Sequence, residues 1–299
     1  MILVTGAGGA AGIAVIRTLR ATGEAVVAVD ADPLAAGLAL AGENAVIAKG
    51  TDETFLSDVR NAIKRFNVDA VICTVAEEML ELAGHDLGAA IWLAPRSAIA
   101  TCVDKRAFSA ALRTAQIPSP ATGDEVPGPW IVKPRFGRGS RDVYSVDRAD
   151  ELQWALRRVD QPVVQTRVDG SEFTVDVLTD HEGRVVAAVP RWRLETKAGI
   201  STKGRTFRDA TVEHIAARTV EALDLRAAVN VQGFVTPDGA VQIIEVNPRV
   251  SGGLSLAQAA GADIVGELVR GTRGKQPRRE RLRFAADVTM SRHFAEVFS

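Results

Sequence analysis

The chain has 299 residues, which is too long for one small domain and fits one large or two to three α/β units at about 150 residues each. Hydrophobic residues make up 46% of the chain and charged residues 24%, so a core can form and a disordered, fibrous or collagen-like protein is excluded. The formal net charge is -1, so no overall field attracts nucleic acid or an anionic membrane surface.

The two cysteines point to a reducing compartment. Cys73 and Cys102 form neither a C-x-x-C pair nor an even disulfide framework, which argues against structural zinc, and both are expected in the core. No apolar run approaches the ~18 residues of a membrane span, and the first residues read as a strand rather than a leader. We therefore expect a cytoplasmic protein that binds neither nucleic acid nor membrane.

The first part of the chain reads as an open α/β domain, expected over residues 1–97. An apolar run at 2–5 leads into a glycine-rich turn at 6–12, then a helical pattern, then a second apolar run at 25–29. Short continuous apolar runs alternating with helices are typical of strands buried in a parallel sheet.

This turn also fits the context of a dinucleotide fingerprint, because Gly6-x-Gly8-x-x-x-Gly12 follows a strand and Asp30 closes the next strand. A nicotinamide-dependent oxidoreductase is therefore one alternative. It lacks further support, since the sole tyrosine, Tyr144, is followed four residues later by Arg148 and so forms no Tyr-x-x-x-Lys pair. The same turn serves equally well as a plain connection from strand to helix.

The second part predicts an α+β arrangement. A helix is expected from about Thr101 to Ala115, where Pro118 and Pro120 prevent its continuation. The basic stretch 270–283 has no interleaved aromatic residues and is expected to be a solvated loop. Strands are expected at 130–133, 143–146, 163–165, 173–178 and 185–189, helices at 149–158 and 211–223, and a hairpin at 229–235 and 241–246.

A candidate metal site lies at the end of this hairpin. Glu245 and Asn247 are two residues apart in a strand, so they share one face, where a carboxylate and an amide oxygen can bind a hard cation. Asn230 and Gln232 on the facing strand supply further amide oxygens. Arg249 follows a proline and can hold a phosphoryl or acyl oxygen from the same side. Magnesium normally accompanies the phosphates of a nucleotide, so this pattern predicts both.

Lysines are scarce, and two of them stand where phosphates could bind. The chain has 29 arginines but only 7 lysines. Lys133 ends a strand and precedes the glycine loop 136–141, whose backbone amides could fold over phosphates, while Lys105 begins a helix. We expect both lysines to neutralise phosphate charge.

In this order the motifs resemble the ATP-grasp superfamily, and most closely the synthetase halves of the carbamoyl phosphate synthetase large subunit and their short stand-alone relatives. Lys133-Pro134 and the loop 137–140 are similar to the phosphate-binding lysine and flap of the family. The segments 163–165 and 170–176 are similar to its adenine hinge and ribose-side acid. Residues 199–202 resemble a Gly-Ile-His-Thr segment with Ser201 in place of histidine. Asn230-Val-Gln232 and the segment 245–251 match its metal strands, with Gln232 where many ATP-grasp ligases carry a carboxylate.

The resemblance implies an ATP-grasp fold with an N-terminal Rossmann-like domain, in which the nucleotide lies between two α+β subdomains expected at 98–166 and 167–299. It implies ATP and Mg²⁺ (or Mn²⁺) as cofactors, with Arg249 and Lys133 as catalytic residues. Arg191 and Arg193, which share a strand face, could hold an anionic substrate, although strand-edge charge explains them as well. The implied nucleotide contacts are Lys105, Lys133, Gly137, Gly139, Ser140, Gln165, Val168, Glu172, Ser201 and Lys203, the metal ligands are Gln232, Glu245 and Asn247, and the substrate contacts are Arg191, Arg193, Ser251 and Gly252.

The implied activity is that of an ATP-dependent ligase, which phosphorylates a carboxylate to an acyl phosphate and joins it to an amine. Phosphorylation of bicarbonate or carbamate uses the same residues and remains an alternative. A catalytically silent nucleotide-binding subunit is another. The expected partners are small-molecule carboxylate and amine substrates, and a homodimer is compatible with the resemblance.

Overall fold

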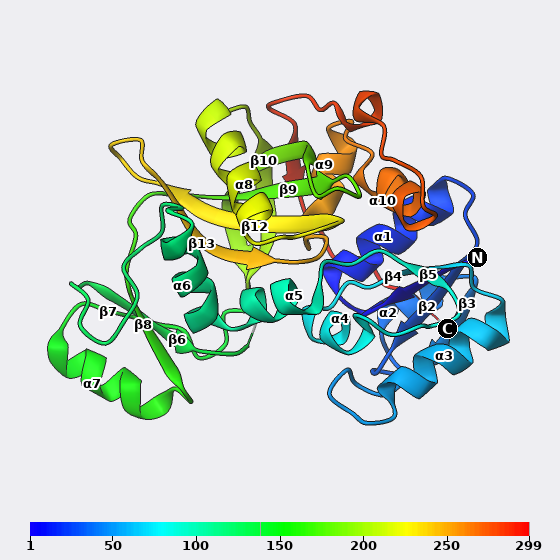
Figure 1. Ribbon diagram of the computed structural model, residues 1–299, viewed down its shortest axis with the longest axis horizontal. Helices are drawn as coiled ribbons and strands as arrows, with labels where there is room; N and C mark the ends of the chain where they lie inside the picture. The colour runs from blue at the N-terminus through cyan, green and yellow to red at the C-terminus, as the bar shows by residue number, and fades with distance from the viewer. Residues whose placement is uncertain (138, 299) are drawn as a thin grey trace.

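The computed structural model describes residues 1–137 and 139–298. Arg138, a member of the predicted glycine loop, lies outside the described residues. Within the described residues the chain forms three sheets, whose arrangement with the surrounding helices is shown in Figure 1. In the same part of the chain, no helix is both long and apolar enough to cross a membrane.

The first sheet is parallel and has the strand order β3-β2-β1-β4-β5. Its central strands are fully buried because their residues are apolar in an unbroken run. Gly6 adopts a φ of 62°, and a Cβ atom there would lie 2.4 Å from Val75, so the turn after β1 requires glycine. The elements are β1 (Ile2–Thr5), α1 (Ala10–Ala21), β2 (Val26–Asp30), α2 (Ala36–Leu40), β3 (Glu43–Val46), α3 (Phe55–Phe66), β4 (Ala70–Ile72), α4 (Ala76–Leu82) and β5 (Ala90–Ile91).

Two helices replace the single helix predicted near 101–115. These are α5 (Arg96–Val103) and α6 (Lys105–Thr114), separated by Asp104 in an extended conformation. The Asp104 carboxylate accepts hydrogen bonds from the main-chain N–H groups of Arg106 and Ala107, which makes it the N-cap of α6. The cap interrupts the helix and places Lys105 at the start of α6.

Residues 130–166 form a small unit that we call the lid. Its antiparallel sheet has the order β7-β6-β8. The lid has a small hydrophobic cluster of its own, which among the described residues comprises Val132, Val146, Ala155 and Val159. Its elements are β6 (Trp130–Pro134), β7 (Tyr144–Val146), α7 (Ala149–Arg158) and β8 (Pro162–Thr166).

The third sheet is antiparallel, with the order β13-β12-β9-β10-β11-β14. Its middle strands are the most deeply buried, and Phe173, Val175 and Val177 of β9 are fully enclosed. The elements from here to the C-terminus are β9 (Ser171–Thr179), β10 (Val185–Lys197), β11 (Ile200–Thr206), α8 (Ala210–Ala222), β12 (Ala228–Val235), β13 (Val241–Asn247), α9 (Leu254–Ala259), α10 (Ile264–Thr272), the 3-10 helix η1 (Arg279–Leu282) and β14 (Thr289–Ser291).

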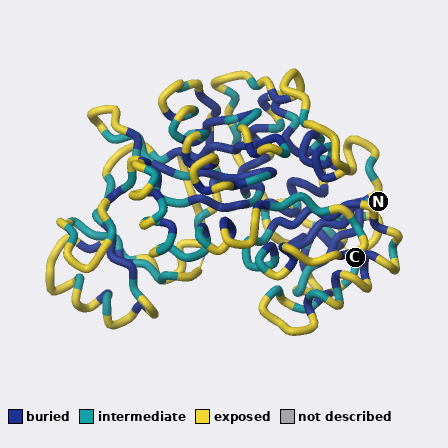
Figure 2. Tube along the Cα trace, in the orientation of Figure 1, coloured by how far each residue is buried: buried dark blue, intermediate teal, exposed yellow. Residues whose placement is uncertain are grey.

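The first and third sheets share their cores. One cluster runs from Leu3 and Val71 through Phe108 and Leu112 of α6 to Phe173 and Ile243. A second cluster joins α1 to α9 and α10. Figure 2 shows the continuous buried centre that results, with exposed loops around it. We call this shared unit, which includes α5 and α6, the body.

The basic stretch 270–283 is mostly exposed, as predicted, but it includes the end of α10 and the 3-10 helix η1, and ion pairs tie it to the body. Arg273 pairs with Glu24 and Asp69 of the first domain, at 2.8 and 3.0 Å. Arg278 pairs with the fully buried Glu267 of α10 at 2.7 Å. This part of the chain therefore fastens the C-terminal helices to the first sheet.

Candidate functional site

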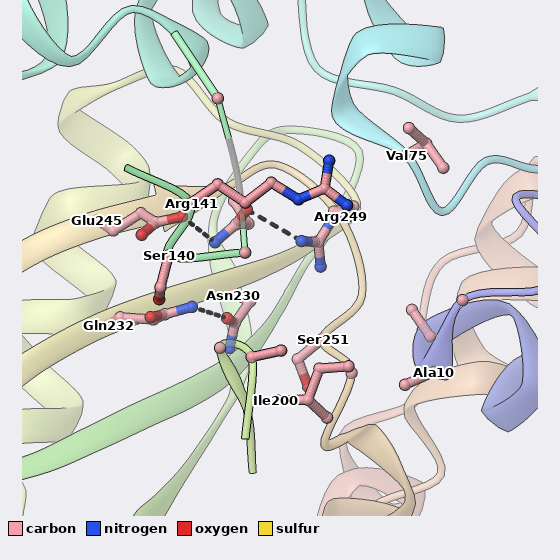
Figure 3. Close-up of a pocket in the computed structure, with 18 of the residues that line it drawn as sticks. Ala10, Val75, Ser140, Arg141, Ile200, Asn230, Gln232, Glu245, Arg249 and Ser251 are labelled. Atoms are coloured by element: carbon pink, nitrogen blue, oxygen red, sulfur yellow. Dashed lines mark hydrogen bonds between the residues drawn. The ribbon is translucent and has the colours of Figure 1, made fainter. Parts of the chain in front are cut away.

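A cavity of about 1580 Å³ lies where the first sheet, the lid and the third sheet meet. It exceeds the roughly 300–1,000 Å³ of a typical small-molecule pocket, so it has room for more than one ligand. Figure 3 shows Glu245, Gln232 and Asn230 on one side and Ala10 of the first domain opposite. Of the predicted site residues, those that line the cavity are Lys105, Lys133, Gly137, Gly139, Ser140, Gln165, Val168, Glu172, Arg191, Arg193, Ser201, Gln232, Glu245, Asn247, Arg249, Ser251 and Gly252.

The hairpin of β12 and β13 brings the predicted metal ligands together. Gln232 lies directly opposite Glu245, and Asn230 lies opposite Asn247. Asn247 Nδ2 donates to Glu245 Oε1 at 3.0 Å, and Gln232 Nε2 donates to Asn230 Oδ1 at 3.1 Å. One carboxylate and several amides therefore converge on one patch of the cavity wall.

The chemistry of this patch fits magnesium, which prefers oxygen ligands. The amides of Gln232 and Asn247 turn their nitrogens to protein oxygens, and their own oxygens accept from Arg193 and Arg249 at 3.3 and 3.1 Å. Each amide oxygen thus already faces a cation. Among the described residues, no group of three or more His, Cys, Asp or Glu side chains could hold a metal, so the patch depends on its amides.

Lys105 and Lys133 face this patch from α6 and from the lid. Lys133 Nζ donates to Gln165 Oε1 at 2.9 Å, and Gln165 in turn donates to Thr122 Oγ1 at 3.0 Å. Burial lowers the pKa of Lys133 to about 8, with Lys105 acting in the same direction and Glu245 against it. Burial also lowers the pKa of Lys105, whose Nζ donates to the Gly137 carbonyl at 3.0 Å. Both amines are poorly solvated, so a bound anion would stabilise their charged forms.

The segment 194–206, which includes the predicted nucleotide contacts Ser201 and Lys203, lies mostly in a hairpin of β10 and β11. The register of the pair shifts between Arg193 and Glu195 and again between Glu195 and Thr196. Because of these shifts Ser201 stays on the cavity side while Lys203 turns away and pairs with Glu195 at 2.8 Å. The structure therefore does not bring Lys203 to the described cavity, contrary to the expected nucleotide contact.

The two strand arginines have different surroundings. Arg191 is 1% exposed, pairs with Asp176 at 2.7 Å, and donates to Ser251 Oγ at 2.8 Å. Through its hydrogen bond to Ser251, Arg191 holds the segment that follows β13 in place. Arg193 reaches Glu172, Gln232 and the turn of the hairpin. Sequence reasoning grouped the two arginines as a substrate contact because their spacing alone does not show these partners.

Sequence reasoning missed the contribution of the first domain. Lys49, Thr51 and Thr74 line the cavity from the loops that follow β3 and β4, and Glu77 lines it from the first turn of α4. The signal was available, because ligands of parallel α/β sheets bind at the carboxyl ends of the strands. Asp30, the acidic residue of the alternative dinucleotide interpretation, accepts from the main-chain N–H groups of Gly8 at 2.7 Å and Asp32 at 3.0 Å.

The chain is similar in sequence to one described family and in structure to several solved proteins. Residues 158–294 match a family described as ATP-grasp in the biosynthetic pathway with Ter operon. The structure resembles the L-amino acid ligase from Bacillus licheniformis with a TM-score of 0.76 and 17% identity, covering 94% of this chain and 75% of that one.

Two carboxylase structures are similarly close. The biotin carboxylase from Campylobacter jejuni, a complex with β-γ-ATP, has a TM-score of 0.76 and 17% identity over 95% of this chain and 73% of that one. The biotin carboxylase domain of 2-oxoglutarate carboxylase from Hydrogenobacter thermophilus, in complex with MgADP, ADP and bicarbonate, has a TM-score of 0.75 and 16% identity, covering 95% of this chain and 72% of that one. The predicted fold class and the predicted similarity to ATP-grasp proteins are confirmed: the chain has the ATP-grasp fold.

Proposed function

We propose that the protein is an ATP-dependent ligase that phosphorylates a carboxylate to an acyl phosphate and joins it to an amine. The observation that carries the proposal is the cavity in which Glu245, Gln232 and Asn247 face Lys105 and Lys133. Support comes from the fold, which is shared with an L-amino acid ligase and with a nucleotide-bound carboxylase.

The residues divide the work of phosphoryl transfer between charge neutralisation and positioning. Glu245, Asn247 and Gln232 would hold magnesium, which would neutralise negative charge on the nucleotide phosphates. Lys133 and Lys105 face the phosphates as point charges, and the glycine loop covers them with backbone amides. Positioned cations supply most of the catalysis in such a transfer, because its charge is spread over several oxygens.

The acyl side of the reaction falls to Arg249 and the segment that follows it. Arg249 lies at the end of β13 beside Asn247, donates to Asn247 Oδ1, and lines the cavity between the metal patch and the first domain. Its planar guanidinium can hold a carboxylate or acyl phosphate through two parallel hydrogen bonds. Ser251 and Gly252 extend this wall, and Arg191 keeps Ser251 in place.

Bicarbonate is the second candidate for the phosphorylated group. One of the similar structures contains bicarbonate together with MgADP, and bicarbonate presents the same oxygen pair to an arginine as a carboxylate does. The two candidates share every residue named above, so they differ in the product and not in the site.

The test is a screen for ADP release from paired carboxylates and amines, with bicarbonate and ammonia included. The Glu245→Ala variant is expected to lose magnesium-dependent ADP formation by at least about a hundredfold, because it removes the carboxylate ligand. Glu43→Ala is the matched control, since Glu43 is an exposed strand glutamate at the edge of the first sheet. Unchanged turnover in Glu245→Ala would exclude the metal assignment. If none of the carboxylate and amine pairs caused ADP release, the ligase function would be excluded.

A further inference from the structure

The first turn of α1 opens into the cavity without a capping side chain. Its N-cap residue is Gly9, no side chain accepts from the start of the helix, and the first turn contains no acidic residue. The first main-chain N–H groups of a helix have no partner within the helix and carry a partial positive charge. Gly9, Ala10 and Ala11 all line the cavity, so these N–H groups lie at its wall. Such a helix start favours an anion, although it does not by itself show that one binds.

A buried arginine nitrogen at the same wall lacks a partner. Arg191 donates from Nε to Asp176 and from NH2 to Ser251, but its NH1 atom is buried and has no hydrogen-bond partner among the described residues. The side chain is 1% exposed and lines the cavity. A Cβ atom on Gly253 would lie 2.4 Å from NH1, so glycine keeps the space beside this nitrogen open. A buried cationic donor without an acceptor is costly, and a ligand can supply the acceptor.

The helix start and the arginine lie at the same end of the cavity. Gly252 lines the cavity in the segment that follows β13, and a Cβ atom on it would lie 3.5 Å from Ala10 Cβ (Figure 3). Arg292 donates to the carbonyl of Gly252 at 2.6 Å. Burial lowers the pKa of Arg292, and the charges of Arg191 and Arg17 lower it further. Positive charge from α1, from β10 and from the residue after β14 therefore gathers here.

We propose that this end of the cavity is a second anion subsite, which binds a carboxylate or phosphate group that the carboxylate substrate carries in addition to the group that is phosphorylated. We call it the α1 subsite, and it consists of the first turn of α1, Arg191 and Gly252–Gly253. The inference rests on the proposed function and adds a substrate class to it, namely small molecules with two anionic groups.

The spacing of the two anion sites suits a small molecule. Arg249, the proposed contact of the phosphorylated carboxylate, is three residues from Gly252, and three residues of chain span at most about 10 Å. A compound with a few carbon atoms between its two anionic groups can therefore contact both sites. Inorganic phosphate and acetate each carry one anionic group and no long carbon skeleton, so they report on the α1 subsite alone.

Amide resonances of the ¹⁵N-labelled protein read this subsite locally. Inorganic phosphate and acetate are titrated without nucleotide and compared with sodium chloride at equal ionic strength. The resonances of Ala10 and Ala11 are expected to shift to saturation with at least one probe, and the tighter probe assigns the second group of the substrate as phosphate or carboxylate. The absence of a saturable shift with either probe would overturn the subsite. Shifts confined to Lys133 and Gly137 would also overturn it, because they would mark the proposed nucleotide site instead.

Two variants test the residues of the α1 subsite. Arg191→Met removes the unpaired donor and should weaken binding of the tighter probe at least tenfold, the effect of losing one hydrogen bond to a charged group. Gly9→Asp places a carboxylate where it accepts from the free N–H groups and repels the anion, so it should weaken binding at least as much. Gly9 is exposed and has a φ of -73°, so aspartate fits there. This variant decides alone if Arg191→Met does not fold by circular dichroism.

Arg205→Met and Thr22→Asp are the matched controls. Arg205 lies on β11 with its side chain 47% exposed, and Thr22 follows the other end of α1, about 20 Å from Gly9 by helical rise. Both variants should bind the probe like the unchanged protein. Unchanged affinity in Gly9→Asp or in folded Arg191→Met would overturn the α1 subsite. Failure of the unchanged protein to bind the ATP analogue AMPPNP with MgCl₂ in calorimetry would instead overturn the proposed function, because the probe titrations contain no nucleotide.

Discussion

The lid and the body differ in how they are held together. The body buries two large clusters that run through both of its sheets, whereas the described lid residues bury a cluster of four small or medium side chains. Hydrophobic stabilisation scales with buried apolar area, so the lid contributes little to its own stability. Yet the lid supplies Lys133 and the glycine loop, while the body supplies the carboxylate and amides. The site is therefore complete only when a weakly stabilised unit lies against a strongly stabilised one.

The difference predicts that core truncations act separately in the two units. Phe173→Ala, in the centre of the third sheet, should lower the free energy of unfolding by about 3–5 kcal/mol, because a fully buried aromatic side chain is lost. Val132→Ala in the lid should cost about 2 kcal/mol locally. Hydrogen exchange should then accelerate across β6–β8 while the main denaturation midpoint stays in place. An equal shift of one common transition would show that lid and body unfold as one.

The pKa of Lys133 should report contact between lid and body, because its burial and its neighbours Glu245 and Lys105 depend on that contact. A pKa of about 8 means that Lys133 is mostly charged below pH 8 and mostly neutral above it. Phosphates favour the charged form, so nucleotide binding above pH 8 must take up a proton. The dissociation constant for ATP is expected to rise by up to tenfold per pH unit there.

Calorimetry in two buffers of different ionisation enthalpy measures this proton uptake directly. Lys133→Met should abolish the dependence of the ATP dissociation constant on pH, and Lys64→Met, on an exposed face of α3, should retain it. A pH-independent affinity in the unchanged protein would contradict the assigned cause.

The smallest effect is expected at the bridge between α6 and the lid. Asp104 pairs with Arg135 at 2.6 Å, and hydrogen bonds from Arg135 hold the pKa of this carboxyl below its usual range. Asp104→Asn keeps an oxygen for the helix cap but removes the charge. Since Arg135 is 36% exposed, the loss should only modestly accelerate exchange in β6, and high salt should mimic it. Asp150→Asn, at a more exposed pair, provides the control.

Local patterns predicted the parts of the site that one hairpin or one turn controls. The period of two put Glu245 and Asn247 on one face. The pairing of Gln232 with Glu245 depends in addition on a register shift between Gln232 and Gly233, which the sequence pattern did not predict. The helix at Ala149–Arg158 has the predicted bounds. These features depend on residues close in sequence, so their pattern is visible before any tertiary contact is known.

Features that depend on register or on distant partners could not be predicted. The side chain of Lys203 points away from the cavity because two register shifts follow Arg193. The residue types in this segment do not predict these shifts. The partners of Arg193 lie on β9 and β12, so its connecting position appears only when the sheet is assembled. The break at Asp104 was readable, because an aspartate before a helical run is a typical N-cap.

The shortage of lysine has a consequence for chemical labelling. Of the 7 lysines, those in the described cavity are Lys49, Lys105 and Lys133. Only an unprotonated amine is nucleophilic, and Lys133 has an appreciable unprotonated fraction at neutral pH because burial lowers its pKa to about 8. A small acylating reagent should therefore label Lys133 near neutral pH, and bound phosphates should protect this amine by keeping it protonated. An enzyme that makes acyl phosphates would thus be shielded from its own intermediate by the charge that holds its nucleotide.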